Sequence, residues 1–233
     1  MARPFRKSVG VIGLGIIGRR IADHLRHQGF SVFVWNRSPR AVPSFVGSPA
    51  ELAQMCNYLQ VFVGDDEALG QVIRSAAPSL TPQHIVIVHS TVSPDSVMEA
   101  AEVVKRRGAR LVEAPFTGSK QAAENGQLVY YLAGDEAARQ EVMPLLRASS
   151  KEIVHVGELG QAAVMKVATN IVTAASVQAA AEAMALVQEA GIPLEKFVEA
   201  LQENASKSGT LDLKLPRMIS GDFETHFSLK HML

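Results

Sequence analysis

Residues 8–35 read SVGVIGLGIIGRRIADHLRHQGFSVFVW, and this stretch decides the fold. A short apolar run rich in β-branched residues leads into a cluster of glycines. A segment with the apolar spacing of a helix follows, and then a second apolar run. Strand, glycine turn, helix and strand in this order predict a βαβ unit with two parallel strands.

The same alternation continues to about residue 156. Further strands are expected at LQVFVG (59–64), HIVIVHS (84–90), ARLVEA (109–114), QLVYYLAG (127–134) and EIVHVG (152–157). Helices are expected at residues 16–29, after Pro49, and at 67–77, 94–108 and 135–148. The strands are apolar at nearly every position, as strands covered on both faces must be. We therefore predict an α/β fold with a doubly wound parallel sheet.

The composition and the periodicity of the sequence change after Gly157. Residues 162–191, AAVMKVATNIVTAASVQAAAEAMALVQEAG, are rich in alanine and apolar around most of a helical circumference, so we predict one long buried helix. A second helix is expected over 193–205, and the remainder has no clear pattern. The expected domains are residues 1–160, the α/β part, and residues 161–233, a smaller all-α part.

Composition narrows the class of function. The chain has 233 residues, 47% of them hydrophobic, and its 23 basic and 23 acidic residues balance. Such a balance disfavours nucleic-acid or anionic-membrane partners and favours small-molecule chemistry. No apolar run approaches the length of a membrane span, the single Cys56 cannot form an internal disulfide, and the histidines lack metal-ligand spacing. We therefore expect a cytoplasmic protein without a metal.

The glycine cluster predicts a dinucleotide site. In this context the first glycine permits the tight turn, the second lets backbone N–H groups approach a pyrophosphate at the helix N-terminus, and the third allows close packing of helix on strand. The alternative is a chance cluster in a strand-to-helix turn, which the complete βαβ setting disfavours. The cofactor-binding residues predicted here are Gly13, Leu14, Gly15, Ile16, Ile17 and Gly18.

The end of the second strand indicates which dinucleotide binds. NAD sites usually place a carboxylate there, about 20 residues after the glycines, whereas this chain has Asn36-Arg37-Ser38. Arg37 can pair with a ribose 2′-phosphate and Ser38 can donate to it, which predicts NADP(H). The alternative is that Arg37 is a solvated loop residue.

Over essentially its whole length the chain resembles the β-hydroxyacid dehydrogenases, a family that includes 3-hydroxyisobutyrate dehydrogenase and glyoxylate/succinic semialdehyde reductase. The motifs that carry this resemblance are GVIGLGIIGRRIADHL, VWNRS, HSTVSP, EAPFTGS and GELGQAAVMKVATN, in family order. EAPFTGSK followed by AAENGQLVYYLAGD looks most like the glyoxylate/succinic semialdehyde reductase branch. The resemblance implies a Rossmann-type fold, an NADP-dependent oxidoreductase acting on a hydroxy or aldehyde acid, and a homodimer that packs through the long helix.

The resemblance also assigns residues to the site. It places Thr117, Gly118 and Ser119 against the substrate carboxylate, with Phe116-Thr117 standing where valine-serine is commoner. It implies that Thr91 contacts the cofactor near the nicotinamide. Phe62, Val63 and Phe227 are cofactor-binding by the same resemblance, while Gly64-Asp65-Asp66 departs from the usual pattern.

Lys166 is the predicted catalytic residue, and its chemistry can be argued from the sequence. Lys166, Asn170 and Thr173 share one face of the long helix by their spacing. Burial on an apolar helix lowers a lysine pKa, which suits a group that protonates a carbonyl oxygen during hydride transfer. By resemblance Asn170 orients the substrate. The alternative is a lysine whose stem lies on the core while its ammonium reaches water.

The resemblance implies a longer second domain than this chain contains. Family members continue past FSLKHML, whereas this sequence ends inside that motif, so the all-α part is expected to be truncated. Reduction of glyoxylate or succinic semialdehyde is the leading expectation, and 3-hydroxyisobutyrate-type oxidation is the runner-up. A non-catalytic NADP-binding scaffold is the alternative of another class. An imine reductase is a third possibility, although such enzymes generally lack the lysine.

Overall fold

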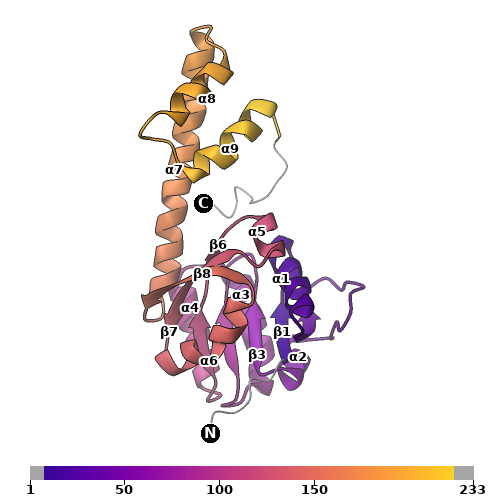
Figure 1. Ribbon diagram of the computed structural model, residues 1–233. Helices are drawn as coiled ribbons and strands as arrows, with labels where there is room; N and C mark the ends of the chain where they lie inside the picture. The colour runs from indigo at the N-terminus through magenta and orange to yellow at the C-terminus, as the bar shows by residue number, and fades with distance from the viewer. Residues whose placement is uncertain (1–7, 223–233) are drawn as a thin grey trace. The chain divides into compact units, whose positions relative to one another are not determined.

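The computed structural model describes residues 8–222 and divides the chain into two compact units, Met1–Lys166 and Val167–Leu233. The first unit is an open sheet with helices around it, and the second is helical (Figure 1). An α/β unit followed by a smaller helical region confirms the predicted fold class. Phe227 lies outside the described residues.

Five parallel strands in the order β2-β1-β3-β4-β5 form the part of the sheet that carries the glycine loop. Their register pairs Ile12 with Trp35 and Val61, Val61 with Val88, and Val88 with Glu113, so all five strands end at one level. The loops that follow them therefore emerge along one edge, where open α/β sheets bind ligands. The bounds are β1 (Ser8–Ile12), β2 (Ser31–Trp35), β3 (Tyr58–Val61), β4 (Ile85–Val88) and β5 (Arg110–Glu113).

The rest of the sheet is not parallel throughout, which corrects the expectation from the sequence. β7 (Leu128–Gly134) runs antiparallel to β5, and the short β6 (Phe116–Thr117) runs antiparallel to β7. β8 (Ser150–Gly157) then pairs parallel to β7. Between β5 and β7 the chain forms only β6 and the short helix α5 (Lys120–Glu124), which do not make the long crossover that a parallel strand needs.

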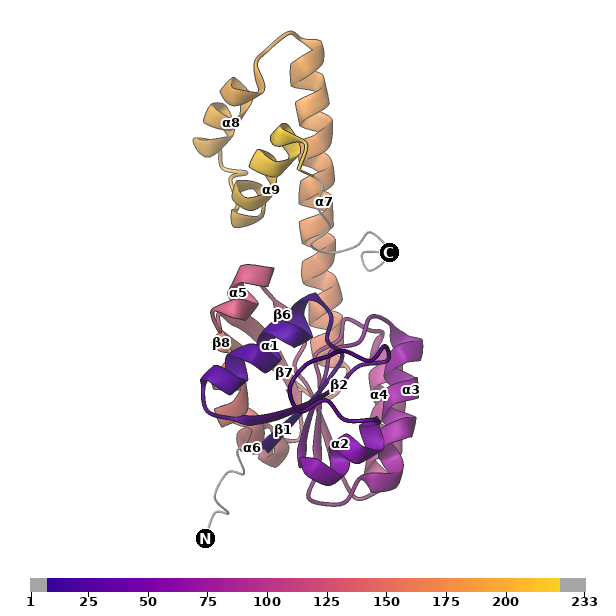
Figure 2. The ribbon, with the colours of Figure 1, turned by 90° about the vertical axis from the view of Figure 1, so that its right-hand side faces the viewer.

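Helices cover both faces of the sheet, as Figure 2 shows. One face packs against α2 (Pro49–Met55), α3 (Asp66–Ala76) and α4 (Pro94–Lys105), with the 3-10 turn η1 (Ala77–Ser79) after α3. The other packs against α1 (Ile16–His27) and α6 (Glu136–Arg147). Each face has its own buried hydrophobic core, which explains why the strands are apolar at successive positions.

The helical region contains α7 (Gln161–Glu189), α8 (Leu194–Gln202) and α9 (Gly209–Ser220), the last of which the sequence left unassigned. The prediction that the long helix is buried is wrong for this chain. Ile171 is 63% exposed, Val172 67% and Leu186 72%, because α8 and α9 cover only part of its surface. The small core there consists of Ala180, Met184, Leu211 and Leu215.

By length and composition α7 could cross a membrane, so the expectation that no apolar run approaches such a span needs correction. A helix from the core of a soluble protein passes the same test, and one such helix is weak evidence for a membrane.

Candidate active site

The glycine loop has the shape that a dinucleotide pyrophosphate requires. Gly13 has φ +96°, and a Cβ there would lie 2.0 Å from the carbonyl oxygen of Phe62. A Cβ on Gly18 would lie 2.0 Å from the carbonyl oxygen of Gly13, so the helix packs against the turn without room for a side chain. A Cβ on Gly15 would meet nothing within 4 Å, and no side chain caps α1. The first N–H groups of α1 therefore face open space and suit an anion.

Asn36 holds the glycine loop against the end of β2. Its side-chain oxygen accepts a hydrogen bond from the N–H of Leu14 at 2.9 Å, and its amide donates to the carbonyl of Ser38 at 2.9 Å. The side chain of Asn36 thus shapes the turn, which sequence reasoning had not foreseen. Arg37 and Ser38 are exposed beside it.

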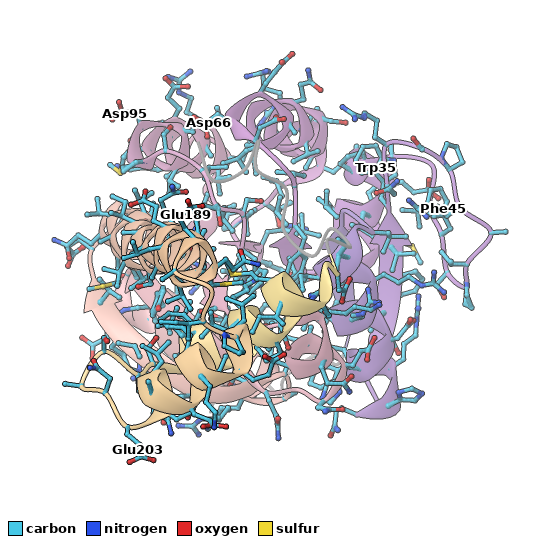
Figure 3. All side chains as sticks on the ribbon, turned by 90° about the horizontal axis from the view of Figure 1, so that it is seen from above. Trp35, Phe45, Asp66, Asp95, Glu189 and Glu203 are labelled. Atoms are coloured by element: carbon cyan, nitrogen blue, oxygen red, sulfur yellow. The ribbon has the colours of Figure 1, made fainter. Side chains whose placement is uncertain are left out.

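The loop after β2 is closed by backbone pairing at its base. The N–H of Val34 donates to the carbonyl of Ser44 at 2.9 Å, and the N–H of Val46 donates to the carbonyl of Val34 at 3.0 Å. Figure 3 labels Trp35 at the end of β2 and Phe45 in the returning segment. The exposed turn that carries Arg37 therefore stands on a fixed base.

Ser90 joins the loops that follow β3 and β4. It is buried, and its hydroxyl oxygen accepts a hydrogen bond from the N–H of Val63 at 2.8 Å. Thr91 is next in the chain and half-buried. Neither Ser90 nor Thr91 caps the following helix: Ser93 does, and its hydroxyl accepts from the N–H of Ser96 at 3.2 Å.

Asp66 has a structural role in the segment Gly64-Asp65-Asp66, where the sequence departs from the usual family pattern. Its carboxylate accepts hydrogen bonds from the N–H and the hydroxyl of Ser93, at 2.9 and 2.6 Å. Burial raises the pKa of Asp66, but the bonds from Ser93 and Ser96 outweigh it and leave the pKa lowered. Figure 3 labels Asp66 in α3 and Asp95 in α4. The start of α3 is thus bound to the start of α4.

A cluster of aromatic rings lies beside the loops after β3 and β4. Phe62 stacks on His89 with ring centroids 4.4 Å apart, and Phe116 lies 6.2 Å from Phe62 and 6.5 Å from Tyr130. His89 is buried, with its ring nitrogens near the carbonyl of Ala114 and the side chain of Gln60, and burial lowers its pKa to about 3. His89 is therefore neutral at physiological pH and packs between Phe62 and Tyr130.

The predicted substrate loop is exposed. Thr117, Gly118 and Ser119 all face solvent, and Gly118 adopts φ +140° with Leu128 beneath it. The hydroxyl of Ser119 accepts from the N–H of Ala122 at 3.2 Å and caps α5, so its side chain has a structural role. The hydroxyl of Thr117 remains the predicted contact for a substrate.

Lys166 lies in the second turn of α7 and is half-buried. Burial lowers its pKa from 10.5 to about 8. Asn170 and Thr173 follow at helical spacing and are also half-buried. Near the start of α7, buried Glu113 accepts hydrogen bonds from the helix N-terminus, a contact that sequence reasoning missed. The sequence feature that could have indicated this contact is an acidic residue, Glu113, at the end of an otherwise apolar strand.

The described residues offer neither a cysteine nucleophile nor a metal site. Cys56 is buried, and burial raises its pKa to about 12, so its thiol is not a nucleophile at neutral pH. Between residues 8 and 222, no group of three or more His, Cys, Asp or Glu side chains could hold a metal ion.

The fold, the glycine loop and the open N-terminus of α1 together define a dinucleotide-binding domain. Residues 8–157 match the model of the NAD-binding domain of 6-phosphogluconate dehydrogenase. Residues 160–233 match that of the NAD-binding region of NADP-dependent 3-hydroxyisobutyrate dehydrogenase. The chain belongs to the β-hydroxyacid dehydrogenase family, whose members are oxidoreductases acting on CH–OH groups.

Individual relatives fall into two kinds. Glyoxylate/succinic semialdehyde reductase 1 of Arabidopsis thaliana is 30% identical, over 96% of this chain and 81% of the relative. The cytokine-like nuclear factor N-PAC of Xenopus tropicalis is also 30% identical, over 98% of this chain but only 45% of the relative. The chain thus spans less than half the length of such relatives.

Solved structures share the fold. A structure of Mycobacterium tuberculosis 3-hydroxyisobutyrate dehydrogenase with L-serine has a TM-score of 0.86 and 21% identity, over 97% of this chain and 82% of that one. At this identity the likeness concerns the fold alone.

Proposed function

We propose that this protein is an NADPH-dependent reductase of a small aldehyde acid, glyoxylate or succinic semialdehyde, with Lys166 as the proton donor. The observation that carries the proposal is the half-buried Lys166, whose pKa burial lowers from 10.5 to about 8. Such an amine is largely protonated at neutral pH yet gives up its proton more readily than an ordinary lysine.

In the proposed reduction, Lys166 donates the proton, and other residues of the chain bind and orient the substrate. NADPH, when bound at the glycine loop, would supply the hydride for the aldehyde carbon. As negative charge develops on the aldehyde oxygen, the Lys166 ammonium stabilises that charge and transfers a proton to the oxygen. Asn170, one helical turn further along α7, orients the substrate, and Thr117 with the Gly118 backbone binds its carboxylate.

The preference for NADPH rests on the turn after β2. It has no carboxylate at the position where NAD sites place one, and the amide of Asn36 is already engaged with Leu14 and Ser38. Exposed Arg37 is available to pair with a 2′-phosphate, which a carboxylate would repel. A KM for NADH below that for NADPH would overturn this assignment.

Phe116 bears on the choice of substrate. It stands beside the predicted carboxylate loop and packs against Phe62 and Tyr130. A ring at this position leaves less space than a valine, which favours a short unbranched aldehyde acid over a branched β-hydroxyacid. 3-Hydroxyisobutyrate oxidation is therefore the second candidate within the same chemistry.

The experiment is an NADPH-consumption assay on glyoxylate, succinic semialdehyde and methylmalonate semialdehyde, with wild type and Lys166→Met. We expect turnover of at least one of the two unbranched acids and none by the variant. Lys151→Met, an exposed lysine on β8, is the matched control and should retain wild-type turnover.

A non-catalytic role is the rival proposal, favoured by the relatives named as nuclear factors. In that case the chain binds NADPH without reducing any acid of the panel. Fluorescence titration of NADPH alongside the assay separates a scaffold, which binds without turnover, from a protein that binds nothing.

Assembly and location are part of the proposal. The exposed apolar residues Ile171 and Val172 of α7 fit a homodimer that buries this surface, and light scattering would measure its mass. We propose the cytoplasm as its compartment, which fractionation would test.

A further inference from the structure

The start of α7 is held by a side chain from a distant strand. Glu113 is the last residue of β5 and is only 1% exposed. One carboxylate oxygen accepts the N–H of Gly160, and the other accepts the N–H of Ala163 at 2.7 Å. α7 begins at Gln161, so these bonds satisfy N–H groups that the helix cannot satisfy by itself.

This arrangement differs from the caps of the other helices. α2, α3, α4, α5, α6 and α9 are each capped by the side chain directly before the helix, namely Ser48, Asp65, Ser93, Ser119, Asp135 and Ser208. The cap on Ala163 comes instead from 50 residues earlier in the sequence. A local cap only satisfies N–H groups at the start of its own helix, whereas a cap from a strand also fixes the helix to the sheet.

The distant cap carries a free-energy cost that a local one avoids. Burial raises the pKa of Glu113, and the N–H bonds from Gly160, Ala163 and Ala162 only oppose that effect. A serine directly before the helix could cap its N-terminus, as serines do in α2, α4, α5 and α9, without burying a charge. Capping alone therefore does not explain a buried carboxylate here, and its distinctive contribution is to fix where the helix begins.

The fixed first turn leads directly to Lys166. Lys166 follows Ala163 by three residues, less than one helical turn, and the backbone of that turn packs closely because Ala162 and Ala163 are buried. We infer that Glu113 is a positioning residue that sets the place of the Lys166 ammonium relative to the sheet edge. This inference rests on the proposed function, since it assigns Glu113 a part in placing the proton donor.

The first test compares Glu113→Asp and Glu113→Gln with wild type. Aspartate keeps the charge but is one methylene too short to reach both N–H groups, while glutamine keeps the length but loses one acceptor. We expect kcat to fall roughly 10- to 100-fold in both, the scale of a displacement of about 1 Å at a reacting group, with KM for NADPH within about twofold. Unchanged kcat in both variants of an active protein would overturn the inference.

The control is Asp135→Ala, which removes the cap of α6, a helix without a predicted site residue. It should lower the melting temperature while leaving kcat unchanged. If Asp135→Ala lowers kcat as much as Glu113→Asp does at equal loss of melting temperature, the effect of Glu113 is general destabilisation and the inference is wrong.

A second readout does not depend on activity. NMR titration of the Lys166 side chain reports its pKa, and we expect that pKa to rise toward the ordinary value in Glu113→Asp because a loosened first turn admits water. Since aspartate keeps the charge, the rise would report hydration. The rise in a protein that reduces no aldehyde acid would refute the proposed function but support the positioning. An unmoved Lys166 pKa together with unchanged exchange of the Ala163 amide would refute the positioning.

Discussion

Replacing Lys166 with methionine should abolish turnover and at the same time stabilise the protein at neutral pH. Methionine keeps most of the length and the apolar contacts of the lysine stem but removes the ammonium. The opposite signs of the two effects make the prediction sharp, because a variant that is inactive through misfolding cannot also be more stable.

The magnitude follows from the pKa of Lys166, which burial lowers from 10.5 to about 8. Each pKa unit corresponds to 1.36 kcal/mol, so the buried charge costs up to about 3 kcal/mol below pH 8. Between pH 8 and 10.5 the folded protein binds fewer protons at this site than the unfolded chain, so wild-type stability rises with pH. We therefore expect Lys166→Met to gain about 2 kcal/mol at pH 7, allowing for partial hydration, and little at pH 10.5.

Urea denaturation of wild type, Lys166→Met and the control Lys151→Met at pH 7 and pH 10.5 measures this difference, and NADPH consumption measures turnover. Activity of wild type should also decline as pH rises through about 8, where Lys166 loses its proton. A variant that reduces aldehyde acids at even one hundredth of the wild-type rate, or a stability gain that is the same at both pH values, would refute the reasoning.

Three further predictions concern the loops along the sheet edge. Arg37→Glu should raise KM for NADPH by roughly 10- to 100-fold, the scale of a charge-assisted bond, and leave KM for NADH almost unchanged; equal effects on both would contradict a 2′-phosphate contact. In Gly18→Ala the new Cβ would lie 2.0 Å from the Gly13 carbonyl oxygen, so the variant should lose about 1–3 kcal/mol of unfolding free energy. Fluorescence titration should also show weaker NADPH binding, and wild-type values of both quantities would rule out the close packing. Ser93→Ala should cost about 1 kcal/mol at pH 7 as the cap of α4 is lost. Because the pKa of Asp66 is lowered, its bonds to Ser93 stabilise the fold above about pH 4, so the difference from wild type should narrow as acid protonates Asp66, and a constant difference would refute that pairing.

Much of the fold could be predicted because its signals are local. Each parallel strand is a short apolar run, and Gly29 and Gly108 adopt the positive φ expected just after a helix. The direction of β7 could not be predicted, because it depends on how the chain after β5 returns and not on the composition of β7 itself. α9 was missed because Pro216 lies inside it and weakens the helical pattern.

In the candidate site, too, features with a local sequence signal could be predicted and features that depend on distant contacts could not. The glycine loop could be assigned because its three glycines follow a strand and open a helix at a spacing that is visible in the sequence itself. The long-range contacts of Asn36 with Leu14 and of Glu113 with Ala163 could not, because they join residues 22 and 50 positions apart and depend on the register of the sheet. Sequence patterns thus identify which residue types reach the edge, and only the fold shows which of them bind one another.

These long-range contacts give the edge a common design. Asn36, Ser90 and Glu113 each follow or end a different parallel strand, and the side chain of each accepts a hydrogen bond from the backbone N–H of another segment. Such bonds leave exposed side chains on the loops that follow, such as Arg37 beside Asn36, to bind ligands while the loops themselves stay fixed. A reaction that needs hydride donor, carbonyl and ammonium within about 3–3.5 Å of one another gains most from loops fixed before the substrate arrives. The polar side chains that fix these loops, Asn36, Ser90 and Glu113, are therefore as necessary to the proposed chemistry as the exposed ones that would contact the substrate.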